Sequence, residues 1–233
     1  MGVAERVSTA VDTDFSAMAE VLRERTDGVV TLTLNRPERR NAITKTMLAE
    51  LLYAVEAASG DDSVRVVVLR GAGKGFCPGD ELRGMGELPA EFRFRPVAPV
   101  SHAALQTALR EAPKPTIAVI HGFAFGVGLD LAMACDFRIA ADDAELRDQR
   151  VIERGMHAVT GCAWFQPRAI GLTRALEFLV LGKPYSGAEA AAAVARERHP
   201  HLRAVACFGV PRHRHAVAIG GDRRAVHRAA GDL

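Results

Sequence analysis

The stretch of sequence that decides the fold is Thr116-Ile-Ala-Val-Ile-His-Gly-Phe-Ala-Phe-Gly-Val-Gly-Leu-Asp-Leu-Ala-Met-Ala-Cys-Asp-Phe-Arg-Ile-Ala140. Its first five residues are apolar or β-branched, which favours a buried strand. A glycine-bearing turn follows at 122–128, and the apolar run from Gly128 to Cys135 predicts a helix that begins near 126–128. A strand, a glycine turn and a helix in this order are typical of βαβ units and of the α/β class.

The same kind of unit occurs on both sides of this stretch. β-Branched runs at 29–34 and 64–69 predict two more strands, each followed by a Pro-, Gly- or polar-containing turn. Residues 44–58 predict a helix, and 171–181 predict another that ends at Gly182. Ser186 stands three residues before Glu189, as in a capping box. The apolar stripe of the first helix consists of Met47, Leu48, Leu51, Leu52 and Val55.

Length and composition exclude several classes of protein. The chain has 233 residues, of which 48% are hydrophobic and 25% charged, so one large globular domain is expected. Lys plus Arg number 30 against 28 acids, so we expect neither a nucleic-acid partner nor a membrane partner. No signal peptide or long apolar span is present, and no Cys-x-x-Cys pair occurs, which together favour a reducing, cytoplasmic location.

The composition divides the chain into three regions. Residues 1–18 read as a flexible lead-in, 19–190 as the folded core, and 191–233 as a tail rich in Arg, His and Ala. From residue 196 onward there are eight Arg, five His, no Lys and three acids. Two interpretations of this tail are open: a shifted reading frame in GC-rich coding DNA, or a native, divergent basic arm.

Four ordered segments identify a resemblance that spans roughly residues 21–189. They resemble the crotonase (enoyl-CoA hydratase/isomerase) superfamily, and the later runs 167–171 and 182–190 are similar to further landmarks of that family. The segments are Leu34-Asn-Arg-Pro-Glu-Arg-Arg-Asn-Ala-Ile43, Val66-Val-Val-Leu-Arg-Gly71 leading to Phe76-Cys-Pro-Gly-Asp-Glu-Leu82, Lys114-Pro-Thr-Ile-Ala-Val-Ile-His-Gly122, and the run from Gly126 to Ala140 quoted in part above.

The resemblance implies a superhelix of repeated ββα units with a helical C-terminal region, which is atypical here. It implies an acyl-CoA thioester as substrate, with coenzyme A as part of that substrate and no other cofactor, and a homotrimer or a dimer of trimers. The family polarises the thioester carbonyl with two backbone N–H groups, which would here belong to Asp80 and Val127. Val127 stands where the family usually has glycine, and valine disfavours a positive φ.

The resemblance also implies the candidate acids. Asp130 lies three residues beyond Val127 and would place one carboxylate beside the reacting carbons. Family hydratases carry a second acid in the segment 144–155, but counting from Asp136 puts Arg150 at that position and counting back from Gly155 puts Val151 there. Glu153 becomes the second catalytic candidate if the backbone is shifted by one residue, and Asp148 is also near in sequence.

The missing acid leaves two kinds of function open. One is an enzyme of the hydratase/isomerase type, for which two-carboxylate hydration is weakened while one-base double-bond migration and other enolate reactions of the superfamily stay open, so hydratase and isomerase are not separated. The other is a catalytically impaired acyl-CoA-binding or assembly protein with the same fold. Arg147 or Arg150 would either meet an anionic acyl group or lie on the surface.

Several further positions are candidates for substrate binding. By resemblance, Arg39 and Arg40 line the nucleotide end of coenzyme A, although a solvated turn is an equally good interpretation. We interpret Glu81 as solvated, and Cys77 as packing rather than as a nucleophile. No metal site is expected, because the His199/His201 and His213/His215 pairs lack companion acids or cysteines. The remaining substrate-binding candidates, also implied by the resemblance, are Ala42, Gly79, Leu82 and Gly126.

Overall fold

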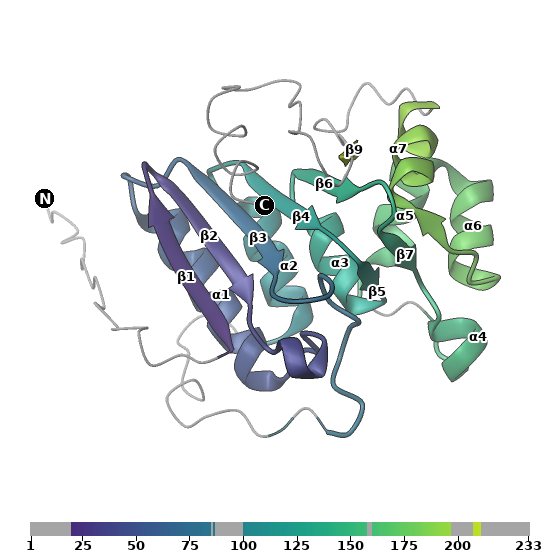
Figure 1. Ribbon diagram of the computed structural model, residues 1–233, viewed down its shortest axis with the longest axis horizontal. Coiled ribbons are helices and arrows are strands. Elements are labelled where there is room, and N and C mark those ends of the chain that lie inside the picture. The colour runs from purple at the N-terminus through teal and green to yellow at the C-terminus, as the bar shows by residue number, and fades with distance from the viewer. Residues whose placement is uncertain (1–19, 85, 87–99, 158–159, 197–206, 211–233) are drawn as a thin grey trace, which may run out of the picture.

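The computed structural model describes residues 20–84, 86, 100–157, 160–196 and 207–210. Its main sheet has the strand order β1-β2-β3-β4-β6-β9, and all neighbours are parallel except β1 and β2 (Figure 1). A smaller sheet has the order β5-β7-β8. The strands are β1 (Val21–Thr26), β2 (Val29–Leu34), β3 (Val66–Gly71), β4 (Thr116–Ile120), β5 (Phe123–Phe125), β6 (Phe137–Ala141), β7 (Glu145–Arg147), β8 (Tyr185–Ser186) and β9 (Cys207–Val210).

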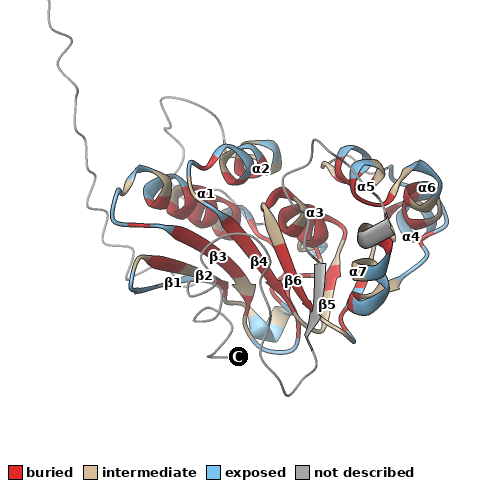
Figure 2. Cartoon of the chain, turned by 90° about the horizontal axis from the view of Figure 1, so that it is seen from above, coloured by how far each residue is buried: buried red, intermediate tan, exposed pale blue. Residues whose placement is uncertain are grey.

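The helices lie along one face of the main sheet and beyond its β6 side. Figure 2 shows α1, α2 and α3 side by side on that face, with their buried sides toward the strands. A short 3-10 turn, Pro37–Arg39, precedes α1. The helices are α1 (Lys45–Gly60), α2 (His102–Glu111), α3 (Val127–Ala134), α4 (Arg150–Arg154), α5 (Cys162–Ile170), α6 (Leu172–Val180) and α7 (Gly187–Arg196).

This order confirms the predicted crotonase-like α/β fold. Strand–strand–helix units recur as β1-β2-α1, β4-β5-α3 and β6-β7-α4. The predicted strands 29–34 and 116–120 are found with those bounds. The strand predicted at 64–69 is instead 66–71, because the N–H of Val64 still bonds Asp61 in a turn and pairing with β2 begins at Val66. The predicted capping box is present: each backbone N–H of Ser186 and Glu189 bonds the other's side chain.

The core lies between the main sheet and α1. The predicted apolar stripe of α1 is buried, and Thr44 caps the helix by accepting a hydrogen bond from the N–H of Met47 at 3.0 Å. Alternate residues of each strand point to opposite faces, so Val30 and Leu32 face the helices while Val29 faces a second, smaller apolar cluster. The sheet is therefore apolar on both faces, as expected for central parallel strands.

The topology gathers the loops of interest at one edge of the sheet. β2, β3, β4 and β6 run parallel, so the segments that follow their carboxyl ends emerge together. These are the segments that begin after Leu34, Gly71, Ile120 and Ala141. The candidates Asp130 in α3, and Arg150 and Glu153 in α4, follow in the helices that come after two of these segments.

Helix α7 crosses residue 190, after which the composition of the sequence predicted a separate tail. α7 continues to Arg196, and the backbone of β9 pairs with β6 from Arg138 to Ala141. The lead-in and the rest of the tail, with its histidine pairs, lie outside the described residues. No helix in the described part of the chain is long and apolar enough to cross a membrane.

Glu50 is a buried acid within α1, and it makes stability depend on pH. The residue is 4% exposed, and its Oε2 has no hydrogen-bond partner among the described residues. Burial raises the pKa of this carboxyl to about 7, and the charge of Glu20 adds to that rise. Between about pH 4.5 and pH 7 the folded protein therefore holds a proton that the unfolded chain releases, so stability falls as the pH rises through this window.

We expect Glu50→Gln to remove this loss of stability. The variant should gain about 2 kcal/mol in free energy of unfolding relative to the parent between pH 5 and pH 8, a part of the full shift because nearby solvent screens the carboxylate. Urea unfolding at both pH values measures the difference. Equal pH dependence in the two proteins would show that Glu50 is charged in the folded state at pH 5.

Candidate active site

The two glycine turns predicted from the sequence lie against each other. The N–H of Phe125 bonds the carbonyl of Cys77 at 2.9 Å, and the N–H of Cys77 bonds Phe123 at 3.2 Å. Gly128 permits this approach, because a Cβ at that position would stand 2.4 Å from the carbonyl oxygen of Cys77. The turn after β3 is thereby fixed beside the start of α3.

The orientation of the peptide bond between Gly79 and Asp80 fixes the direction in which the N–H of Asp80 points. The carbonyl of Gly79, in the same unit, accepts a hydrogen bond from the N–H of Ile43 at 2.9 Å. In a trans peptide the N–H points opposite to the carbonyl, so the N–H of Asp80 points away from Ile43. It makes no hydrogen bond within the part of the chain that the structure describes.

The second N–H belongs to Val127, the first residue of α3, where helix geometry provides no intrahelical acceptor. The concern about valine at this position does not arise, because the positive φ falls on Gly126 (φ 49°) and Val127 is helical. A Cβ at Gly79 would lie 3.4 Å from the nitrogen of Val127, so the two turns are in van der Waals reach. Two unbonded N–H groups thus lie on neighbouring turns at a helix N-terminus.

Asp130 is fully buried in α3 and is held by a guanidinium. Nη1 of Arg150 lies 3.1 Å from Oδ2 of Asp130, and Nη2 lies 3.5 Å from Oδ1. The hydroxyl of Thr160 accepts from Nη1 of Arg150 at 2.6 Å and donates to Oδ2 of Asp130. Of the two contacts with Arg150, the one to Oδ1 is therefore the longer.

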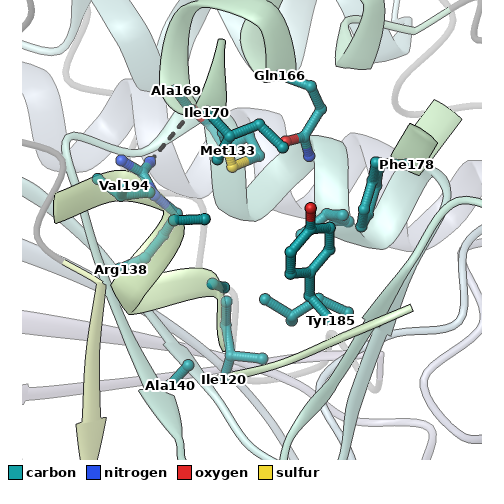
Figure 3. Close-up of a pocket in the computed structure, with 14 residues that line it drawn as sticks. Ile120, Met133, Arg138, Ala140, Gln166, Ala169, Ile170, Phe178, Tyr185 and Val194 are labelled. Atoms are coloured by element: carbon teal, nitrogen blue, oxygen red, sulfur yellow. Dashed lines mark hydrogen bonds between the residues drawn. The ribbon is translucent and has the colours of Figure 1, made fainter. Parts of the chain in front are cut away.

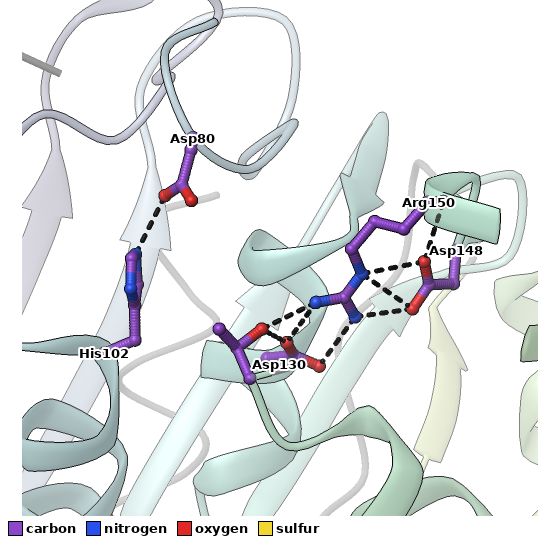
Figure 4. Close-up of polar contacts among 6 residues, drawn as sticks. Asp80, His102, Asp130, Asp148 and Arg150 are labelled. Atoms are coloured by element: carbon purple, nitrogen blue, oxygen red, sulfur yellow. Dashed lines mark hydrogen bonds and ion pairs between the residues drawn. The ribbon is translucent and has the colours of Figure 1, made fainter. Parts of the chain in front are cut away.

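Asp148 completes the cluster from the opposite side of Arg150. Its carboxylate accepts from Nη2 at 2.5 Å and from Nε at 2.9 Å, and it also caps the N–H of Arg150 at 3.1 Å. Figure 4 shows the guanidinium lying between the two aspartates. Burial lowers the pKa of Arg150, but the hydrogen bond to Asp148 and the charge of Asp130 outweigh that effect and raise the pKa above its usual value.

Arg150 is therefore neither a surface residue nor a free anchor for an acidic acyl group. It is 8% exposed, and its donors are directed at Asp130, Asp148 and Thr160. Counting from Asp136 placed it correctly beside Asp130. The sequence did not assign a role to Asp148 or Thr160. The sequence feature that could have indicated a role for Asp148 is its position two residues before Arg150.

Glu153 is not brought to Asp130. Its side chain is 44% exposed and pairs with Arg147 at 3.0 Å on the surface of α4 and β7. The interpretation of Arg147 as a surface arginine fits this placement better than a role in binding the acyl group. The second acid near Asp130 is Asp148, on the far side of a guanidinium.

The predicted coenzyme A turn forms a small charged cluster. Arg39 donates two hydrogen bonds to Glu81, at 2.8 and 3.0 Å, so the interpretation of Glu81 as solvated was wrong. Arg40 is exposed and left-handed (φ 56°). Ala42 is buried, whereas Leu82 is 70% exposed. Arg40 and Leu82 therefore have the exposure that contact with a ligand requires.

The cysteines and histidines that the structure describes offer no rival chemistry. Cys77 is fully buried, and burial raises the pKa of its thiol to about 12, which favours packing over nucleophilic attack. Among the described residues no group of three or more His, Cys, Asp or Glu could hold a metal ion.

An apolar cavity of about 40 Å³ lies apart from these groups (Figure 3). Ile120, Met133, Phe178 and Tyr185 contribute to its walls, whereas Asp80, Val127 and Asp130 do not. The buried Arg138 also borders it, and its Nη1 bonds the carbonyls of Ala132, Met133 and Cys135 at the end of α3. The volume suits one or two water molecules rather than an acyl chain.

Comparison with known proteins agrees with the class that the fold and site define, the crotonase superfamily. The family model described as Enoyl-CoA hydratase/isomerase matches residues 24–194. The chain is 38% identical over 167 residues to the probable enoyl-CoA hydratase EchA12 of Mycobacterium tuberculosis H37Rv, which covers 70% of this chain and 59% of that relative. The chain thus spans about 59% of the length of this curated relative.

Solved structures agree with this assignment. A monofunctional enoyl-CoA isomerase from M. smegmatis is 36% identical, with a TM-score of 0.62 over 76% of this chain and 75% of that one. A putative enoyl-CoA hydratase from Streptomyces coelicolor A3(2) is 28% identical, with a TM-score of 0.72 over 99% and 78% of the two chains. This protein belongs to the enoyl-CoA hydratase/isomerase family.

Proposed function

We propose that this protein is an acyl-CoA enzyme that moves a carbon–carbon double bond, an isomerase rather than a hydratase. The observation that carries the proposal is Arg150: the position beside Asp130 where hydration needs a second acid holds a guanidinium. Water addition needs one group to deprotonate water and another to complete protonation, whereas double-bond migration needs a single proton carrier. Relatives named hydratase and isomerase are both similar to this chain, so the choice rests on Arg150.

In the proposed reaction the thioester oxygen of a 3-enoyl-CoA accepts hydrogen bonds from the N–H groups of Asp80 and Val127. Asp130 removes a proton from C2, and the negative charge spreads from C2 to C4 and onto the thioester oxygen. The same carboxyl group returns the proton to C4, which leaves the double bond between C2 and C3. The N–H groups stabilise charge that is absent in the ground state, so they lower the barrier.

The charge arrangement supports this assignment of roles. Oδ2 of Asp130 is fixed by Arg150 and Thr160, which sets the orientation of the carboxylate. Oδ1 makes the longer contact with Arg150, 3.5 Å to Nη2, and it is the oxygen that we assign to proton transfer. Asp148 accepts hydrogen bonds from Nε and Nη2 of Arg150. These bonds keep the guanidinium from turning toward the acyl group.

One experiment separates the functions. The purified full chain is incubated with 3-hexenoyl-CoA and, separately, with 2-hexenoyl-CoA. Mass spectrometry detects added water, and the ultraviolet absorbance of the conjugated thioester detects double-bond migration. We expect the 3-enoyl substrate to become conjugated without a change of mass, and the 2-enoyl substrate to gain no water beyond the uncatalysed rate. Addition of one water at an enzymatic rate would overturn the isomerase assignment.

A second candidate, an acyl-CoA-binding protein without turnover, is favoured by the complete burial of Asp130 in an ion pair. Calorimetric titration with the same thioesters, and with free coenzyme A as control, tests it: binding without conversion supports this candidate. The trimer or dimer of trimers remains a prediction, to be measured by light scattering.

A further inference from the structure

The side chain of Asp80 contacts a histidine, His102, while its backbone N–H is unbonded among the described residues. Its carboxylate oxygen Oδ1 lies 2.9 Å from Nε2 of His102, and Figure 4 shows this pair apart from the Asp130 cluster. The two side chains are 20% and 29% exposed, so the contact is largely shielded from water. The contact joins two segments 22 residues apart in the chain.

The backbone holds His102 firmly enough to act as an anchor. It is the first residue of α2, directly after the cap Ser101, whose hydroxyl accepts from the N–H of Ala104 at 3.1 Å. Leu105 and Leu109, three and seven residues further on, share its helical face and are buried to 1% exposure. α2 packs against α1 and α3, so the imidazole is fixed relative to the start of α3.

The neighbours of Asp80 are fixed by other contacts. The carbonyl of Gly79 and the N–H of Glu81 both bond to the backbone of Ile43 at 2.9 Å, and the carboxylate of Glu81 is held by Arg39. These bonds set the position of the turn. The side chain of Asp80 is held by His102, at 2.9 Å from Oδ1 to Nε2.

We propose that His102 is a positioning residue that fixes the Asp80 peptide as an oxyanion donor. This inference rests on the proposed function in that Asp80 is assigned there as a donor. An N–H that is aimed at the thioester oxygen must not tilt as charge develops, because its stabilising effect depends on preorganised geometry. Without the imidazole, rotation of the Asp80 side chain would allow the turn to relax, or the free carboxylate to repel the developing negative charge.

The first test compares His102→Ala with His102→Gln in the full chain, using 3-hexenoyl-CoA. We expect the alanine variant to lose about tenfold in kcat while KM changes less than about twofold, because the lost interaction acts on the transition state. The glutamine variant should recover most of kcat, since its amide nitrogen can reach the position of Nε2. His121→Gln is the matched control. Nε2 of His121 bonds the carbonyl of Gly73 at 2.8 Å and not Asp80, so kcat and KM should both be unchanged.

The second test reads the polarised carbonyl directly and does not need turnover. Hexanoyl-CoA labelled with ¹³C at the thioester carbon is bound to the parent and to each variant, and its carbonyl stretch is measured by difference infrared spectroscopy. The parent should lower the frequency relative to free thioester, His102→Ala should reverse part of that shift, and His102→Gln should restore it. If the parent protein shifts the carbonyl band of the bound thioester but does not catalyse isomerisation, the proposed reaction is refuted while the role of His102 stands.

Three results would overturn the inference. The first is a wild-type kcat and carbonyl band in His102→Ala, and the second is the lack of a carbonyl shift in the parent itself. The third comes from a double-mutant cycle with Asp80→Asn, which keeps the N–H but alters the contact: the two losses must be strongly non-additive if they break one interaction. Independent, multiplying losses would show that His102 acts elsewhere.

Discussion

Arg150→Met should be the most destabilising single substitution in the site. The guanidinium pairs with two carboxylates that are 0% and 1% exposed, and methionine of similar length would leave both buried charges without this positively charged partner. Breaking a buried ion pair from one side typically costs about 3–5 kcal/mol. Urea unfolding of the parent and variant at pH 7 measures the loss.

Two companion variants identify the cause. Arg147→Met removes an arginine whose partner Glu153 is 44% exposed, and should cost less than about 1 kcal/mol. The triple variant Asp130→Asn, Asp148→Asn, Arg150→Met removes all three charges and should recover most of the stability lost by the single change. If the triple variant is as unstable as Arg150→Met, packing of the arginine stem rather than charge pairing explains the loss.

Asp130→Asn should have the largest effect on turnover. Asparagine keeps the size of the side chain and an oxygen that can accept from Arg150, but it cannot carry the proton from C2 to C4. Loss of a general acid–base group typically lowers the rate about 10²–10⁴-fold. The free energy of unfolding should change little, since Arg150 remains paired with Asp148. Initial rates with 3-hexenoyl-CoA give the answer.

Glu177→Gln provides the matched control for this prediction. Glu177 is an acid in α6 whose side chain is 41% exposed and pairs with Lys183, and its amide variant should retain the parental rate. Retention of full turnover by Asp130→Asn would remove this residue from the mechanism. Asp148→Asn would then be the next variant to test.

Local sequence signals predicted part of the fold. The β-branched runs and the apolar stripe at 44–58 are short-range features, and β2, β4 and α1 formed close to where these features placed them, whereas β1, α2 and α5 were not predicted. The shift of β3 by two residues shows the limit of such signals, since partner strands and the preceding turn decide where pairing begins.

Candidate site residues were named only where one segment contains the information. The resemblance carried by the two glycine turns named Asp80, Val127 and Asp130, and their roles stay predictions. The contacts of Asp130 with Arg150 and Thr160 span 20 and 30 residues, and no local pattern encodes them. The assignment of Glu153 failed for the same reason, because the direction of a side chain on the short helix α4 depends on what packs beside it.

The sequence by itself thus determined the α/β class, strands β2 and β4, helix α1 and the positions of the two glycine turns, because strand, turn and helix preferences act over a few residues. Only the tertiary structure decided that Arg150 lies between Asp130 and Asp148, and that His102 holds Asp80. The physical reason is burial: a charged group removed from water needs a partner, and the fold, not the neighbouring sequence, selects which distant side chain supplies it.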